Sequence, residues 1–127
     1  MDISPIQQPA NVFSSMCSSR GALQHVTGRW GSLTMVALKR SDEPMRFAEI
    51  RRKVEGISDR MLSQTLAQLE RDGMVDRTVH SSIPPHVDYT LTPLGTKLAD
   101  ALVLLVSTVE AELDQVVRAQ EIYDKQH

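Results

Sequence analysis

Residues 48–73 read AEIRRKVEGISDRMLSQTLAQLERDG, and this stretch decides the fold of the chain. Ile50 and Val54 are four residues apart, which places both side chains on one side of a short helix over residues 48–54. Gly56 ends that helix, because glycine tolerates the positive φ found at helix ends. Ser58 is then a natural N-cap, so the stretch predicts two short helices joined by a turn of about three residues.

The second of these helices has the clearest signal in the chain. Its apolar residues form one stripe, made of Met61, Leu62, Leu66 and Leu69. Asp59 suits the positive end of the helix dipole, and Asp72-Gly73 ends the helix. The opposite face is polar; it displays Asp59, Arg60, Ser63, Gln64, Ala67, Gln68 and Arg71.

The hydrophobic period changes from 3.6 to 2 residues after Gly73. Alternating segments over residues 75–80 and 87–91 are separated by residues 81–86, which are too rich in proline to pair as a strand. We therefore expect a β-hairpin with a long tip. Thr92-Pro93 follows as an N-cap with proline at the first helical position.

Helical spacing also predicts helices on both sides of this unit. Leu23 and Val26 share a face of a helix that begins near Arg20, and another helix follows over residues 30–39. From Pro93 a long helix is expected to reach Glu121 or beyond.

Two tandem short helices followed at once by a hairpin are typical of a winged helix-turn-helix. The predicted fold class is mainly α with a small β-hairpin wing and a long C-terminal dimerisation helix. We expect a flexible N-terminal arm over residues 1–19, the winged helix-turn-helix DNA-binding domain over 20–92, and the dimerisation helix over 93–127, all within one compact domain.

The C-terminal helix carries an apolar stripe that is too long for a monomer of 127 residues to bury. We expect this stripe to form the interface of a homodimer. Its predicted interface residues are Leu98, Leu102, Leu105, Val109 and Leu113.

Composition excludes several classes of protein. No apolar run approaches the ~18 residues of a membrane span, and a single cysteine excludes a disulfide framework and a multi-cysteine zinc site. We expect a small cytoplasmic protein with no membrane partner, no cofactor and no enzymatic activity. Residues 1–91 carry 11 Lys/Arg and 10 Asp/Glu (net +1), whereas residues 92–127 carry 3 and 6 (net −3), so charge alone does not settle the function.

The polar helix face predicts base contacts in the major groove of double-stranded DNA. Arg60 is suited to guanine, Gln64 to adenine, and Ser63 to base edges or phosphate. Ser58 lies at the same helix end, and Asp59 serves either as a cap or salt-bridge partner or as a contact to cytosine. On the preceding helix Arg51 and Arg52 are expected to reach phosphate, although Arg52 or Lys53 can equally pair with Glu49 or Glu55.

The hairpin is expected to contact the minor groove or phosphate. The residues predicted to do so are Arg77, Ser81, Ser82 and His86. His80 and His86 are six residues apart with no further ligand in the sequence pattern, so we expect no metal site.

Several blocks of sequence together resemble one family. They are GRW (28–30), FAEIR (47–51), GISDRML (56–62), DGMVDR (72–77), PPHVDY (84–89) and LTPLG (91–95). Over residues 17–98 the chain resembles the HxlR-type bacterial transcription regulators, which are related to the MarR regulators. The resemblance implies a homodimeric winged-helix protein that binds operator DNA. It also implies that a cysteine before the first helix senses electrophiles or oxidants.

Cys17 lies thirteen residues before Trp30, at the spacing expected for that cysteine, although Ser18 follows it where the family usually has proline. Its polar flanks suggest exposure, and both the helix N-terminus and Arg20 favour the thiolate. We therefore expect redox sensing through Cys17, with an oxidant, quinone or aldehyde as effector. Because the chain has no second cysteine, oxidation of Cys17 is expected to end in an intersubunit disulfide, a mixed disulfide with a small thiol or a sulfur oxyacid.

Three alternatives to this function differ in class. One is a regulator of the same fold gated by a non-covalent small-molecule ligand. Another is a winged-helix protein-interaction module without DNA binding, against which the exposed basic and polar faces argue. The third is a small thiol enzyme, for which His25 is the nearest candidate base and no close Cys/His pair exists.

Overall fold

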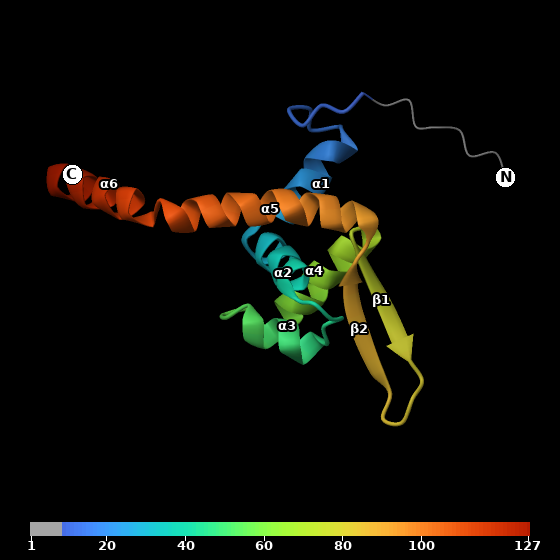
Figure 1. The fold of residues 1–127 in the computed structure, drawn as a ribbon. Coiled ribbons are helices and arrows are strands. Elements are labelled where there is room, and N and C mark those ends of the chain that lie inside the picture. Colours follow the sequence, from blue (N-terminus) through green and yellow to red (C-terminus); the bar gives the residue numbers. More distant parts are fainter. Residues whose placement is uncertain (1–8) are drawn as a thin grey trace.

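The computed structural model describes residues 9–127, which form a mainly helical molecule with one antiparallel hairpin (Figure 1). Its elements in chain order are α1 Ser18–Thr27, α2 Arg29–Arg40, α3 Phe47–Lys53, α4 Asp59–Arg71, β1 Val75–His80, β2 His86–Leu91, α5 Pro93–Ala111 and α6 Leu113–Gln126. This arrangement confirms the predicted winged helix-turn-helix fold. None of the helices over residues 9–127 combines the length and apolar character that crossing a membrane would need.

The core is built around α2, which contacts α1, α3, α4, α5 and β2. The largest fully buried residues are Met35, Ile50, Leu62, Leu69, Val75 and Thr34. At the crossing of α1 and α2, a Cβ on Gly31 would overlap the carbonyl oxygen of His25. Glycine is therefore required for the close contact between these two helices.

The pair α3 and α4 forms as the sequence predicts. Gly56 has φ +90° in the turn, and the Ser58 hydroxyl accepts a hydrogen bond from the Met61 backbone N–H at 3.1 Å. One expectation needs correction, because Met61 is 38 % exposed and does not belong to the buried stripe. Thr65 is buried on that face instead, since it lies three residues after Leu62 and faces the same side of the helix.

The wing pairs residue by residue from Val75↔Leu91 to His80↔His86. His86 is therefore the first residue of β2. The sequence pattern had placed it in the tip of the hairpin, and this expectation is wrong. Met45 forms an isolated antiparallel bridge with Tyr89, with hydrogen bonds in both directions at 3.1 and 2.8 Å. This bridge attaches the base of the wing to the segment that enters α3.

The predicted long C-terminal helix is divided in two. Thr92 caps α5 through its hydroxyl, as predicted, but α5 ends at Ala111 and α6 begins at Leu113. The Thr108 hydroxyl donates to the carbonyl oxygen of Leu104 at 2.8 Å, a contact that often bends helices. Figure 1 shows α5 continuing into α6 away from the rest of the molecule.

The segment before α1 was expected to be a flexible arm over residues 1–19. Residues 1–8 of this arm lie outside the described part of the chain. Residues 11–17 form turns, with hydrogen bonds from Ser14 N to Asn11 O and from Cys17 N to Ser14 O. The first helix begins at Ser18, slightly earlier than predicted, and Cys17 is its N-cap residue.

Candidate nucleic-acid interface

The exposed face of α4 carries the side chains that the sequence selected for base recognition. Arg60, Ser63 and Gln64 are all exposed, whereas Leu62, Leu66 and Leu69 anchor the opposite face in the core. Because Ser58 uses its hydroxyl to cap the helix, its side chain has a structural role at this end. The three exposed side chains are therefore held on a rigid helix with chemistry suited to base edges.

Arg51 and Asp59 form an ion pair between α3 and α4. The guanidinium Nη1 lies 3.0 Å from Oδ1, and both side chains are exposed. Of the two roles considered for Asp59, this geometry favours the salt bridge. The pair also offsets the carboxylate charge beside the helix N-terminus, where a free anion would repel phosphate.

Arg52 and Lys53 are the other two cations of α3. Neither forms an ion pair with any of residues 9–127, and both are exposed. Glu49, one of the partners considered for them, instead accepts a hydrogen bond from the Arg46 backbone N–H at 3.1 Å and so caps α3. The two cations remain available to an anion.

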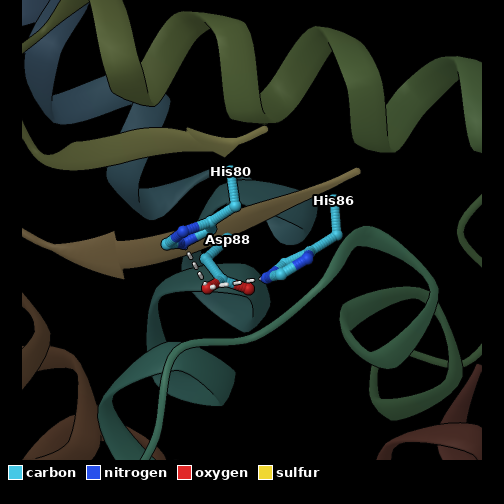
Figure 2. Close-up of side chains that lie close together, drawn as sticks. All are labelled: His80, His86 and Asp88. Carbon is cyan, nitrogen blue, oxygen red and sulfur yellow. Dashed lines mark ion pairs between the residues drawn. The ribbon is translucent and has the colours of Figure 1, made fainter. Parts of the chain in front are cut away.

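The polar side chains of the wing are either exposed to solvent or turned towards another side chain of the wing. Arg77, Ser81 and Ser82 are exposed, as their predicted DNA contacts require. His86 lies differently, because its side chain is turned towards Asp88. Figure 2 shows His80 and His86 on either side of the Asp88 carboxylate, with nitrogen–oxygen distances of 2.9 and 3.7 Å. The sequence pattern indicated no third metal-binding side chain near these histidines, whereas the structure places the Asp88 carboxylate beside both.

Cys17 is more enclosed than its polar flanks suggested, with 9 % of its surface exposed. Its Sγ lies 3.0 Å from the Ser19 hydroxyl and 3.5 Å from the Asn11 backbone N–H. These hydrogen bonds, that of Ser19 first, lower the pKa of the Cys17 thiol from its ordinary value. The thiolate is therefore favoured by donors next to the sulfur, and Arg20 is not among the causes.

An ion pair joins α1 to α4, and no sequence pattern predicts it. His25 Nδ1 in the last turn of α1 pairs with the carboxylate of Asp72, the C-cap residue of α4, and both side chains are largely buried. The two residues are 47 positions apart and share no motif. Through this pair α1, whose N-cap is Cys17, is attached to the C-terminal end of α4, the helix that carries the exposed Arg60, Ser63 and Gln64.

The apolar stripe of the C-terminal helices divides at Leu102. Leu102 is only 6 % exposed and lies in the core of the single chain, and Leu98 packs against the same core. Beyond this point Leu105 is 57 % exposed. Other exposed apolar side chains on α5 and α6 are Leu104, Val109, Leu113, Val116, Val117, Ile122 and Tyr123.

Comparison with known proteins gives a consistent result. The family described as HxlR-like helix-turn-helix matches residues 25–117. YtfH of Escherichia coli K12, an uncharacterised HTH-type transcriptional regulator, is 41 % identical over 111 residues, which cover 87 % of this chain and 86 % of YtfH.

Solved structures agree with the sequence matches. The structure of ytfH from Salmonella typhimurium superposes with a TM-score of 0.81 and 44 % identity, covering 89 % of this chain and 99 % of that protein. The redox regulator HypR in its oxidised form superposes with a TM-score of 0.67 and 33 % identity, covering 75 % of this chain and 96 % of HypR.

Proposed function

Because this chain belongs to the HxlR-like helix-turn-helix family of transcriptional regulators, we propose that it is a dimeric, sequence-specific DNA-binding regulator whose operator affinity changes when Cys17 is modified. The observation that carries the proposal is the exposed face of α4, where Arg60, Ser63 and Gln64 stand clear of the core. In this fold the second helix of the motif enters the major groove, and the wing contacts the flanking backbone.

The exposed apolar surface of α5 and α6 supports the proposed dimer. Leu105, Val109 and Leu113 are each more than half exposed, and an apolar surface continued along two helices is a mark of an interaction site. A second copy of the chain supplies a matching surface under two-fold symmetry. Two copies of α4 then read two half-sites about 34 Å apart.

Cys17 supplies the proposed chemical sensor. Its hydrogen bonds favour the thiolate, which is the nucleophilic form. With diamide, two thiols lose two electrons and two protons to the reagent and form one disulfide, which joins Cys17 either to the partner's copy or to a small thiol. With a quinone, the thiolate adds to a ring carbon; the C=C π electrons move to the conjugated carbonyl oxygen, the ring takes up a proton in place of the one lost from the thiol, and the product is a thioether-linked hydroquinone. The similarity to HypR, a redox regulator, supports this reading.

The path from Cys17 to DNA runs along α1. Cys17 is the N-cap of this helix, and His25 near its end pairs with Asp72, the C-cap of α4. A bulky group on Cys17 displaces the start of α1, and Gly31 leaves no free space at the crossing with α2 to absorb that shift. Movement of α1 therefore changes the position of α4.

DNA binding is tested by fluorescence anisotropy with the DNA upstream of the protein's own gene and with random DNA of equal length. We expect tighter binding to the upstream DNA and a linear fall of log affinity with log salt, because each neutralised phosphate releases a counterion. Equal affinity for both DNAs at all salt concentrations would contradict sequence-specific binding. No binding to either would favour a protein-interaction module.

Sensing is tested by comparing wild type with Cys17→Ser before and after diamide. The wild type is expected to change its operator affinity by at least ~10-fold, a coupling free energy of about 1.4 kcal/mol. The variant should bind like the reduced wild type and ignore the oxidant. If both proteins respond alike, Cys17 is not the sensor.

Gating by a non-covalent ligand has one observation in its favour. An apolar pocket lies between α1, α2 and α5, lined by Thr27, Ser32, Leu102, Leu105, Val106 and Val109. If an apolar effector lowers the operator affinity of Cys17→Ser as much as that of the wild type, this pocket becomes the candidate effector site.

A further inference from the structure

Three side chains with metal-binding atoms gather on one face of the wing. His80 and His86 are paired directly across β1 and β2 in the antiparallel register. Asp88 follows His86 by two residues, so its side chain leaves the same face of the strand. The register of the hairpin therefore places two imidazoles and one carboxylate together.

The distances between the donor atoms fit a small cation. The Asp88 oxygen lies 2.9 Å from Nε2 of His80 and 3.7 Å from Nε2 of His86, and one donor atom from each residue lies within 4.8 Å of the others. Ligands of a tetrahedral Zn²⁺ at its usual bond lengths are about 3.4 Å apart. The two imidazole rings are stacked, with centroids 4.5 Å apart, so binding an ion would require side-chain rotations, for which the partial exposure of all three residues leaves room.

The surroundings of the cluster also suit a metal. The other ring nitrogen of His86, Nδ1, lies 3.4 Å from the Ser82 hydroxyl. A partner on the second nitrogen is usual for a metal-ligating histidine, because it fixes which nitrogen faces the ion. His86 and Asp88 also line an open groove, whose charged residues include Glu43, Glu49, Arg46 and Arg52, so the cluster is open to solvent.

We propose that His80, His86 and Asp88 bind one divalent transition-metal ion of the Zn²⁺ class per chain, with water at the remaining position. Two imidazoles and one carboxylate are a donor set that Zn²⁺ accepts, and hard ions such as Mg²⁺ prefer all-oxygen sites. Because the ligands come from both strands, the ion links β1 to β2 where the hairpin opens into its tip. The site does not depend on the proposed function, since the protein alone binds the ion.

Binding is tested by calorimetric titration of ZnCl₂ into the full-length, chelator-treated protein. We expect saturation at one Zn²⁺ per chain and a higher melting temperature of the loaded protein, because an ion that binds only the folded state stabilises it. MgCl₂ should give neither effect. Absence of saturable Zn²⁺ binding would overturn the proposal.

The ligands are identified with the variants His86→Gln and Asp88→Asn, and with His127→Gln as the matched control, because His127 lies at the C-terminus far from the wing. His86→Gln and Asp88→Asn should bind Zn²⁺ at least ~10-fold more weakly, because losing even a residue that only orients a metal ligand typically costs about 10- to 100-fold in affinity, and these residues are the proposed ligands themselves. The control should bind like the wild type. Unchanged affinity in His86→Gln or Asp88→Asn would overturn the assignment.

X-ray absorption of the Zn²⁺-loaded wild type identifies the atoms that surround the ion, and this measurement does not depend on how the variants fold. We expect only nitrogen and oxygen neighbours, with the scattering pattern of two imidazoles. A sulfur neighbour would place the ion at Cys17 and overturn the proposal.

Discussion

Cys17 and Ser19 are two residues apart at the start of α1, and the Ser19 hydroxyl lies 3.0 Å from the sulfur. The sequence predicted a thiolate-favouring position from the helix N-terminus, which proved to be where Cys17 lies. It could not predict the two hydrogen-bond donors, because the Asn11 N–H reaches the sulfur only through the turns of residues 11–17. The Ser19 hydroxyl, the Asn11 N–H and the Ser19 backbone N–H together lower the pKa of the Cys17 thiol.

Replacing Ser19 with alanine removes the largest cause of that lowering, so the pKa of the Cys17 thiol should rise. The thiolate forms above the pKa, and the iodoacetamide reaction rate of the variant should therefore reach its half-maximum at a higher pH than that of the wild type. At pH 7 the variant should react more slowly, and above both pKa values the two rates should converge. Ser18→Ala is the matched control, because no hydrogen bond links Ser18 to the sulfur; an identical pH profile for Ser19→Ala and wild type would contradict the prediction.

Thr34 of α2 is fully buried, and its hydroxyl has no hydrogen-bond partner among residues 9–127. An unsatisfied buried hydroxyl is costly, so the isosteric Thr34→Val should raise the free energy of unfolding by about 1 kcal/mol. Urea unfolding followed by circular dichroism measures this change. Thr34→Ser keeps the hydroxyl and loses a methyl group, and should be destabilised; lower stability of the valine variant would mean that the hydroxyl has a partner in solution.

At the scale of elements, the proposed contact with DNA is divided between α4, which would read bases, and α3, which would bind phosphate. Arg60→Ala should cost roughly 1–3 kcal/mol on the upstream DNA and much less on random DNA, as expected for a base contact. Arg52→Ala should weaken binding to both DNAs about equally, because phosphate carries no sequence information. Anisotropy titrations on the two DNAs measure both effects, and an equal loss for Arg60→Ala would place Arg60 among the phosphate contacts.

An element is predicted well from the sequence when neighbouring residues determine it, and poorly when distant residues do. The start of α4 follows from Ser58, whose capping role needs only the next three residues. The wing shows the limit of local signals, because the sequence placed His86 in the tip. One residue in the length of the tip decides whether His86 faces His80, and that register is set by strand pairing along the whole hairpin.

At the scale of the whole molecule, the C-terminal helices extend beyond the core that the single chain can build. The sequence predicted a stripe that the monomer cannot bury. Which part of that stripe the single chain buries depends on how α5 packs against α2. The sequence therefore could not predict that Leu102 is buried and Leu105 exposed. The break between α5 and α6 was missed for a similar reason. Neither proline nor glycine marks Glu112, and its neighbours are good helix formers.

Leu105→Glu places a charge in the middle of the proposed dimer interface. The chain should become monomeric and lose most of its operator affinity, because burying an unpaired charge is strongly unfavourable. Light scattering measures the mass, and circular dichroism checks that the fold is kept, which is expected because Leu105 is more than half exposed in the single chain. Ser107→Glu, with the same charge on another side of α5, should remain dimeric; a dimeric Leu105→Glu that binds DNA would contradict the proposed interface.

The extension of α5 and α6 beyond the core has a thermodynamic consequence for the proposed dimer. A second copy that covers this apolar surface binds only the folded chain, so it stabilises the fold by an amount that grows with the logarithm of the protein concentration once dimers form. Dilution then removes part of the stability without any change in the chain, and the melting temperature should rise with protein concentration. Such a regulator is least resistant to unfolding when few copies are present, so its lifetime is set by its abundance as well as by its sequence.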